Sequence, residues 1–419
     1  MPTCRTRSAC RLCGGTALAT ALTLAPTPPA NDFRPKEHLH KRQKSYPLEV
    51  LLCEKCGHAQ LAHIVDPESL FSNYLYVSGT SPSFVAHFEA YASDTWDLAN
   101  AGIGDLVVDI GSNDGTLLKV FKTLGARIIG IDPAHKIASS ANAAGIPTIC
   151  DFFTAKVAEQ IKNEVGSAKI VTANNVFAHI DDLSGIVESV KKLLTTDGIF
   201  VFEVSYLLDI LNKTLFDTIY HEHLDYHAVS PLIPFFQRHG LILFHVERIA
   251  SHGGSIRVYT ALENGAPPST SGLKRTLEAE LAARLFNIET YNEFANAIKI
   301  AGINLRETLS TSRHIGRKIA GYGAPAKATT LMHQFRLSRN DLAYIVDDSP
   351  WKQGLFSPGL DIPIVPASYL NVEPVDDLLI LAWNFAEPII TNNRSFLETG
   401  GRFIVPLPEL KVVTSDEPH

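Results

Sequence analysis

The amino-acid sequence predicts an α/β protein in which a small cysteine-rich module precedes two Rossmann-like domains. Strand-like apolar runs alternate with helical segments between residues 105 and 246, and a second series of the same kind begins at Lys318. Such alternation is typical of a parallel sheet with helices on both faces. We expect the three parts to span residues 1–70, 71–246 and 247–419.

The order of the elements follows from hydrophobic periodicity and from glycine turns. A helical stretch over 82–100 leads into the first series. Its expected strands are 106–110, 127–131, 170–173 and 198–203, with a helix over 116–124. The segment 274–311 is long and amphipathic, and further strands follow from Lys318 onward and over 342–346, 378–382 and 401–405.

Composition and charge indicate a globular protein that does not bind nucleic acid. The chain has 419 residues, of which 45% are hydrophobic and 19% charged, so it can bury a large core. Its net charge is −7 and no long basic run is present, which disfavours a nucleic-acid partner.

The apolar run Ala17–Ala25, which follows Arg5, Arg7 and Arg11, resembles a secretory signal but contains threonines and ends in prolines. It is also shorter than the roughly 18 apolar residues of a membrane span. We expect no membrane segment and place the protein in the cytoplasm.

Two C-x-x-C-G pairs predict a structural zinc site in the first module. Cys10 and Cys13 form one pair and Cys53 and Cys56 the other. Two such knuckles supply four thiolates for tetrahedral zinc, and no ligand position is left for chemistry. Free core cysteines and a redox dithiol are the alternatives, and the paired pattern favours zinc over both.

The run from Leu106 to Gly115 predicts a cofactor-binding strand and turn. Gly111 and Gly115 let a ligand approach the backbone, and Asn113 tolerates a left-handed conformation. Asp109 is expected to face a ligand ammonium group, and Asp132 after the next strand to bind ribose hydroxyls. The further expected cofactor contacts are Ser112, Pro133, Asp151, Phe152, Asn174 and Asn175.

These expected cofactor contacts favour S-adenosylmethionine over a nicotinamide dinucleotide, because the fingerprint Gly-x-Gly-x-x-Gly is absent from this domain. An ordinary strand-to-helix turn is the alternative interpretation of the glycines taken alone.

The segment 218–227 contains three histidines, His221, His223 and His227, together with two tyrosines and two acids. The metalloprotease pattern His-Glu-x-x-His is missing, so a second zinc site is disfavoured. Acid–base chemistry next to a ketone fits better, because neutral imidazole accepts a proton near pH 7 and a tyrosine hydroxyl stabilises an enolate oxygen. A polar network in the core remains the alternative.

Taken together, the motifs resemble the three-domain C-methyltransferases that act on dTDP-linked keto-deoxysugars in antibiotic and cell-surface sugar pathways. The resemblance covers nearly the whole chain. It is carried by Cys10-Arg-Leu-Cys-Gly14, Pro26-Thr-Pro-Pro-Ala-Asn-Asp32, Cys53-Glu-Lys-Cys-Gly57, Tyr74-Leu-Tyr76, Tyr220-His-Glu-His223, His252-Gly-Gly-Ser-Ile-Arg257, Gly321-Tyr-Gly-Ala-Pro-Ala-Lys327 and Asp347-Asp-Ser-Pro350.

The resemblance implies a zinc-binding domain, a central methyltransferase domain that binds S-adenosylmethionine, and a C-terminal domain that helps to hold the nucleotide sugar. It implies that the methyl group arrives at C-3 beside a C-4 ketone, and that the protein is a monomer. It places the general base at His223, with Tyr220, Glu222, His179 and either Tyr74 or Tyr76 as further active-site residues. The substrate contacts that we expect are His221, Arg257, Tyr322 and Lys327.

Two other functions are open at this stage. Gly321 to Ala326 fits Gly-x-Gly-x-x-Ala after a strand, and Asp347 follows at the distance of a dinucleotide-binding acid, which suggests an NAD-dependent nucleotide-sugar oxidoreductase. Pro325 disfavours it by removing one amide from the turn. A non-catalytic zinc-ribbon adaptor is the third candidate, and the polar residues at the strand ends disfavour it.

Overall fold

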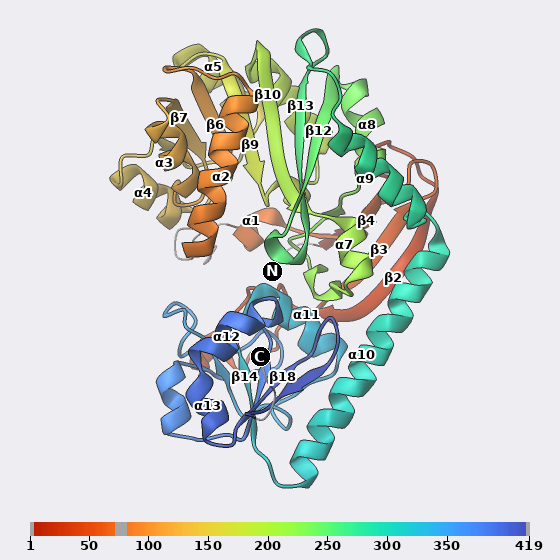
Figure 1. Ribbon diagram of the computed structural model, residues 1–419, viewed down its shortest axis with the longest axis vertical. Helices are drawn as coiled ribbons and strands as arrows, with labels where there is room; N and C mark the ends of the chain where they lie inside the picture. Colours follow the sequence, from red (N-terminus) through yellow and green to blue (C-terminus); the bar gives the residue numbers. More distant parts are fainter. Residues whose placement is uncertain (1–3, 72–81, 416–419) are drawn as a thin grey trace.

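The computed structural model describes residues 4–71 and 82–415 and arranges them in three parts (Figure 1). The central α/β domain lies at the top of the figure and the C-terminal α/β domain at the bottom. The strands of the N-terminal module lie to one side between them, and the long helix α10 (Ile288–His314) runs down that side. The expected α/β class, with two Rossmann-like parts behind a cysteine module, is confirmed.

The N-terminal module is built on antiparallel strands. Its elements are β1 (Cys4–Thr6), β2 (Leu18–Thr27), the 3-10 turn η1 (Lys36–His38), β3 (Tyr46–Cys53), β4 (Ala59–Leu61), β5 (His63–Val65) and α1 (Pro67–Phe71). β1 pairs with β5, while β2, β3 and β4 share a four-stranded sheet whose edge strand β11 (Asp225–Tyr226) comes from the central part of the chain. The apolar run after Cys13 is therefore strand β2 of this sheet.

The central domain holds a seven-stranded sheet in the order β12-β13-β10-β9-β6-β7-β8. Its strands are β6 (Leu106–Ile110), β7 (Arg127–Ile131), β8 (Thr148–Ile149), β9 (Ala168–Asn174), β10 (Leu194–Ser205), β12 (Leu241–Ile249) and β13 (Ser255–Leu262). Its helices are α2 (Pro82–Leu98), α3 (Thr116–Thr123), α4 (His135–Ala143), α5 (Ala155–Glu164), α6 (Leu183–Leu193), α7 (Leu207–Asn212) and α8 (Val229–Arg238), with 3-10 turns η3 (Phe177–His179), η4 (Phe216–Thr218), η5 (Ser251–Gly253) and η6 (Glu263–Gly265).

The strand order reverses between β6 and β9, and this reversal places the ligand crevice. β6 pairs in parallel with β7 on one side and with β9 on the other. The connections that leave the carboxyl ends of β6 and β9 therefore diverge to opposite faces of the sheet, and ligands of doubly wound folds bind in the gap between them. All five residues of β6 are buried, because helices cover both faces.

The expected boundary between residues 246 and 247 falls inside β12. β13 pairs antiparallel with both β12 and β10, so the central sheet runs on to Leu262. A hairpin that follows the last crossover is the physical reason, since antiparallel neighbours need only a short turn.

The C-terminal domain repeats the doubly wound plan in a six-stranded sheet of order β16-β15-β14-β17-β18-β19. Its strands are β14 (Ile319–Tyr322), β15 (Ile345–Val346), β16 (Ile364–Val365), β17 (Asp377–Ile380), β18 (Arg402–Val405) and β19 (Lys411–Val413). Its helices are α11 (Ala326–Gln334), α12 (Ala386–Asn392) and α13 (Arg394–Glu398), with 3-10 turns η7 (Ala367–Asn371) and η8 (Trp383–Phe385).

The amphipathic segment before this sheet forms two helices, α9 (Ser271–Ala282) and α10. Arg284 takes a left-handed conformation with φ of 48°, which ends the first helix. The side chain of Asn287 then caps α10 by accepting a hydrogen bond from the backbone amide of Glu289.

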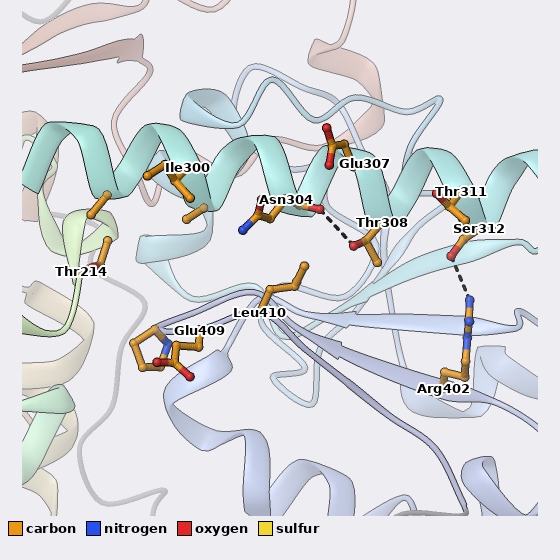
Figure 2. A pocket seen from close by; sticks show the side chains of 13 residues that line it. Thr214, Ile300, Asn304, Glu307, Thr308, Thr311, Ser312, Arg402, Glu409 and Leu410 are labelled. Carbon is orange, nitrogen blue, oxygen red and sulfur yellow. Dashed lines mark hydrogen bonds between the residues drawn. The ribbon is translucent and has the colours of Figure 1, made fainter.

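A groove of about 780 Å³ runs along α10, where the helix faces the end of the C-terminal sheet (Figure 2). Asn304, Thr308 and Ser312 line it from the helix. On the other side it is lined by Arg402, in β18, and by Leu410, directly before β19. Of the expected site residues that fall within 4–71 and 82–415, none lines this groove. In the part of the chain that the structure describes, every helix is too short or too polar to cross a membrane.

Candidate active site and metal centre

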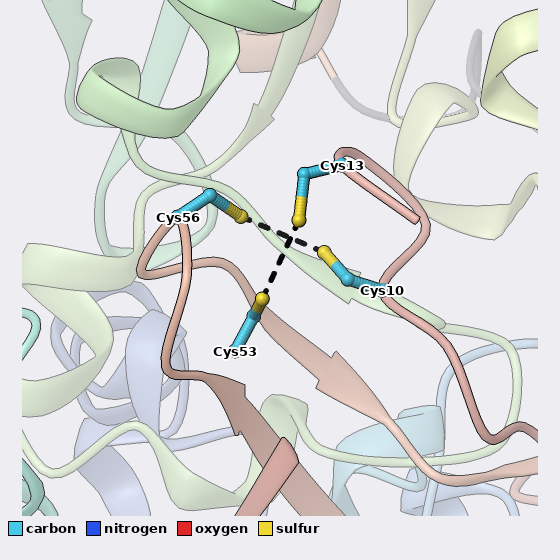
Figure 3. Close-up of side chains that lie close together, drawn as sticks. All are labelled: Cys10, Cys13, Cys53 and Cys56. Carbon is cyan, nitrogen blue, oxygen red and sulfur yellow. Dashed lines mark hydrogen bonds between the residues drawn. The ribbon is translucent and has the colours of Figure 1, made fainter. Parts of the chain in front are cut away.

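The four cysteines converge on one point (Figure 3). Their Sγ atoms lie within 4.8 Å of one another, with Cys10 and Cys56 3.6 Å apart and Cys13 and Cys53 3.5 Å apart. A zinc ion with Zn–S bonds of about 2.3 Å requires sulfur atoms about 3.8 Å apart in a tetrahedron. The donor set and its spacing therefore fit zinc, and four thiolates leave no open coordination position.

Glycines shape the two knuckles that carry these thiols. Gly14 and Gly57 have φ values of 68° and 77°, in the left-handed region. Their amides donate to the carbonyls of Cys10 and Cys53, at 2.9 and 2.8 Å, which closes each knuckle into a tight turn. The other two cysteines lie elsewhere, Cys4 in β1 and Cys150 exposed after β8.

The turn after β6 lies at the point where the strand order reverses. Gly111, Asn113 and Gly115 have positive φ values of 70°, 51° and 75°. The amides of Gly111 and Ser112 both donate to the carbonyl of Ile131, at 2.8 and 3.1 Å. A Cβ atom on Gly111 would lie 2.3 Å from Cγ2 of Val176, so only glycine permits this approach to the loop after β9.

Asp132 fixes this turn from the end of β7. Its Oδ2 accepts from the amide of Asn113 at 2.9 Å, and its Oδ1 accepts from the amide of Ala134 at 2.8 Å. Burial raises the pKa of this carboxyl group. Each oxygen retains a further lone pair, which a ribose hydroxyl can use.

Asn174, at the end of β9, provides a test of whether the crevice fits a polar ligand. Both polar atoms of its side-chain amide are buried and have no hydrogen-bond partner within residues 4–71 and 82–415. A buried amide without partners costs free energy, so such a group points to a ligand that supplies them. The carboxylate and ammonium of a methionine moiety have the required acceptor and donor.

The remaining cofactor candidates lie at several depths. Asp109 is buried within β6, where Thr172 donates to it at 2.6 Å and burial raises its pKa to about 7. Asp151 is exposed and accepts from the amide of Phe152, while Pro133 follows Asp132 directly. Asn175 adopts a left-handed conformation, and its amide donates to the carbonyl of Glu203.

Burial separates the three histidines of the segment 218–227. His221 and His227 are fully buried, and burial lowers their pKa values to about 4 and about 3. Nε2 of His221 lies 3.3 Å from the carbonyl of Pro47, and the ring of His227 packs against Phe177 and His58. His223 alone of the three is partly exposed.

A hydrogen bond fixes the tautomer of His223. Its Nδ1 lies 2.6 Å from the backbone carbonyl of Thr218, and a carbonyl can only accept. Nδ1 therefore carries the hydrogen, and in the neutral ring Nε2 carries the lone pair that can take a proton.

The imidazole of His223 is one of four aromatic rings that form a continuous column. The ring of Tyr220 lies 4.1 Å from that of His223, His223 stacks on His179 at 5.1 Å, and His179 stacks on Phe71 at 5.3 Å. Burial lowers the pKa of His179 to about 4, so this ring is neutral at pH 7. The column contains two of the expected active-site residues beside His223.

Glu222 faces the N-terminal module. Its carboxyl group is 2% exposed and accepts two hydrogen bonds from Nδ2 of Asn31, at 2.9 and 3.2 Å. Burial raises the pKa of Glu222 to about 7, although the Asn31 bond lowers it. Asn31, Thr218 and Phe71 were not among the residues expected to form the site. The proline-rich run that contains Asn31 was the available signal, but no local pattern links it to Glu222.

Arg257 and Tyr322, two of the expected substrate contacts, bind other side chains. Arg257 is 2% exposed, forms ion pairs with Glu203 and Glu247, and covers the ring of Tyr91 at 4.2 Å. The hydroxyl of Tyr322 accepts from Asn393.

Lys327 and Asp347 lie near the turn that joins β14 to α11, with Asp347 directly after β15. Lys327 is the second residue of α11, with Nζ 5.7 Å from the ring centre of Trp383. Both carboxylate oxygens of Asp347 accept hydrogen bonds from backbone amides, those of Ala324 and Ser349. This is the arrangement of Asp132 in the central domain. Tyr74 and Tyr76 lie outside the described residues.

Comparison with known proteins assigns the family. Three family models match in chain order: a putative zinc binding domain over residues 10–71, a methyltransferase domain over 88–243, and a C-methyltransferase C-terminal domain over 250–408. The C-methyltransferase NovU of Streptomyces niveus is 35% identical over 407 residues, which cover 97% of each chain. This chain belongs to the C-methyltransferase family. It is an S-adenosylmethionine-dependent C-methyltransferase with a structural zinc site, and the expectations for enzyme class and cofactors are confirmed.

More distant similarities concern parts of the chain. The mitochondrial ubiquinone biosynthesis O-methyltransferase of Bos taurus is 28% identical over 116 residues, which are 26% of this C-methyltransferase and 30% of that protein. A solved S-adenosylmethionine-dependent methyltransferase from Clostridium acetobutylicum is 13% identical, with a TM-score of 0.35, and the match covers 42% of this chain and 92% of that one.

Replacing Glu222 with glutamine should stabilise the fold more at about pH 8 than at about pH 5. The pKa of this carboxyl group is about 7 in the folded protein and about 4.3 in an unfolded chain. Between these values only the unfolded chain releases the proton, so stability falls as the pH rises. Glutamine carries no charge and keeps an oxygen for Asn31. We expect the unfolding temperature of Glu222→Gln to exceed that of the wild type by a few degrees at pH 8.

The control is Glu54→Gln, which alters an exposed glutamate of the same module. It should leave the unfolding temperature unchanged at both pH values. An equal difference between Glu222→Gln and wild type at pH 5 and pH 8 would show that the buried carboxyl group is already ionised at low pH.

Proposed function

We propose that this C-methyltransferase places a methyl group on C-3 of a dTDP-linked 4-keto-deoxysugar, with His223 as the general base. The observation that carries the proposal is the state of the His223 ring. Its Nδ1 donates its hydrogen to the carbonyl of Thr218, its Nε2 carries the lone pair, and the ring lies between a tilted Tyr220 and the neutral, stacked His179. The working unit is proposed to be a single chain, as the family resemblance implies.

Transfer to carbon requires a base, because carbon must carry an electron pair before it can attack a methyl group. A hydrogen on the carbon beside a ketone is acidic enough for imidazole to remove. In the proposed step, Nε2 of His223 takes the C-3 proton, the C–H electron pair forms the C-3 to C-4 double bond, and the carbonyl pair moves onto O-4. We assign Tyr220 to donate its hydroxyl hydrogen to O-4, which stabilises the enolate.

The electron pair on O-4 then returns to restore the ketone, and the pair of the C-3 to C-4 double bond forms the new bond from C-3 to the methyl carbon. S-adenosylmethionine, when bound, supplies an electrophilic methyl group, and the sulfur keeps the electron pair of the broken S–CH3 bond. We assign the turn 111–115, Asp132 and Asn174 to hold this cofactor. His223 holds the proton taken from C-3 and later releases that proton to solvent.

The nucleotide is assigned to the C-terminal domain because α11 meets the histidine segment. Oγ1 of Thr330 donates to the carbonyl of Ile219 at 3.0 Å, and Nε1 of Trp383 donates to Asp217 at 2.6 Å. Lys327, on the first turn of α11, brings a cation to this junction. A sugar whose diphosphate is bound there has its ring beside the segment that carries His223.

Replacing His223 with glutamine should lower kcat by about 10²- to 10⁴-fold, the range expected for loss of a general base. The affinity for S-adenosylmethionine, measured by calorimetry, should stay within about twofold, because the ring acts on the substrate proton. His239→Gln is the control: it alters a half-buried histidine that pairs with Glu188, outside the ring column. Near-normal turnover by His223→Gln would reassign the base to His179 or His221.

Replacing Asn174 with alanine should weaken S-adenosylmethionine binding by about 10- to 100-fold, because the ligand then loses hydrogen bonds to charged groups. The unfolding temperature of the ligand-free protein should be unchanged or higher, since the amide has no partner to lose in the described residues. Asn142 is the control, because its side-chain amide, unlike that of Asn174, bonds the backbone of Ala138 and Thr148. Asn142→Ala should lower stability. A stability loss without an affinity loss in Asn174→Ala would refute the assignment.

A further inference from the structure

Arg11 leaves the first cysteine knuckle and reaches the loops that carry both active-site histidines. The residue lies between Cys10 and Cys13, yet it is only 4% exposed. Its Nε donates to Asp181 at 3.0 Å, and its Nη1 donates to the carbonyls of Leu61 and Leu224, at 3.0 and 3.2 Å. One guanidinium group therefore binds three separate segments of the chain.

Two of these segments adjoin the ring column directly. Asp181 follows His179 by two residues, and Leu224 follows His223 by one. The amide of Leu224 donates to the carbonyl of Ala178 at 2.8 Å, and its carbonyl accepts from the amide of Leu61 at 2.8 Å. Arg11 thus bonds to the residue through which the two histidine loops touch.

The second knuckle makes a matching contact. His58, which follows Gly57, lies with Nε2 2.6 Å from Oδ1 of Asp225, and both side chains are fully buried. Oδ2 of Asp225 lies 3.9 Å from Nε of Arg11. Each knuckle of the zinc site therefore provides one side chain, Arg11 or His58, that contacts the segment beginning at His223.

The charges in this contact are balanced by arginine. Burial alone would raise the pKa of Asp181, but Arg11, Arg7 and Arg5 together lower it. Arg11 is the fully buried member, with a side chain that is 0% exposed, whereas the side chains of Arg7 and Arg5 are 25% and 62% exposed. Only Arg11 also bonds to the backbone beside His223.

We propose that Arg11 is a positioning residue of the transfer reaction, which ties the zinc-binding knuckle to the His179 and His223 loops and sets the place of the two rings. The inference rests on the proposed role of His223. The guanidinium group suits this task because its planar fork presents several N–H donors in a fixed geometry. Lysine has the same charge but a single ammonium centre, and cannot reach Asp181, Leu61 and Leu224 at once.

The test is Arg11→Lys, which keeps a positive charge beside Asp181 and so preserves the fold. We expect kcat to fall by about 10- to 100-fold, the effect of moving a catalytic group by about 1 Å. The zinc content and the affinity for S-adenosylmethionine should match those of the wild type. The control is Arg5→Lys, which alters an exposed arginine that pairs with the same carboxylate and should leave kcat unchanged.

A second readout does not depend on turnover. Amide hydrogen exchange in peptides that cover residues 177–182 and 218–226 should be faster in Arg11→Lys than in Arg5→Lys, and the ring signals of His179 and His223 in histidine-labelled protein should shift. A merely structural role would lower zinc content and cofactor affinity together with kcat, and that result would overturn the proposal.

Unchanged exchange and unchanged ring signals would also overturn it. Full activity of His223→Gln, in contrast, would refute the proposed base while leaving the exchange and ring measurements to decide the role of Arg11.

Discussion

The pairing of β11 with β4 is the contact on which the site depends. Asp225 and Tyr226, which follow His223 by two and three residues, join the edge of the N-terminal sheet opposite Gln60 and Ala59. On the other side, His227 forms a β-bridge to Tyr206, the residue directly after β10. The histidine segment is therefore held between two sheets, and the hydroxyl of Tyr226 donates back to the carbonyl of His223. A mobile loop could not keep an imidazole at one place, and this pairing removes that freedom.

Burial then decides what each polar group can do. Desolvation favours the neutral form of an imidazole, so His179, His221 and His227 stay uncharged at neutral pH. The same effect raises the pKa values of Glu222 and Asp109 to about 7. A neutral surrounding suits a base that must be unprotonated before the reaction. Where charge is retained, as at Asp181, arginines compensate it.

Local signals in the sequence predicted much of the fold, because strands, turns and cysteine knuckles are short-range patterns. The expected strands 106–110 and 127–131 coincide with β6 and β7, and the four cysteines converge as their spacing indicates. Long-range contacts have no such pattern. Arg11 lies 170 positions from Asp181, and Asn31 lies 191 positions from Glu222. No pattern in the sequence predicts either pairing. The burial of Arg257 among Glu203, Glu247 and Tyr91 likewise depends on which strands become neighbours.

Hydrogen exchange at the substrate carbon tests whether the imidazole of His223 forms the enolate. The enzyme is mixed in D2O with a dTDP-4-keto-deoxysugar and S-adenosylhomocysteine, which has no methyl group to transfer. We expect the wild type to replace the C-3 hydrogen with deuterium, as followed by NMR, and His223→Gln to do so no faster than buffer. Equal exchange by the two proteins would show that the imidazole of His223 does not form the enolate.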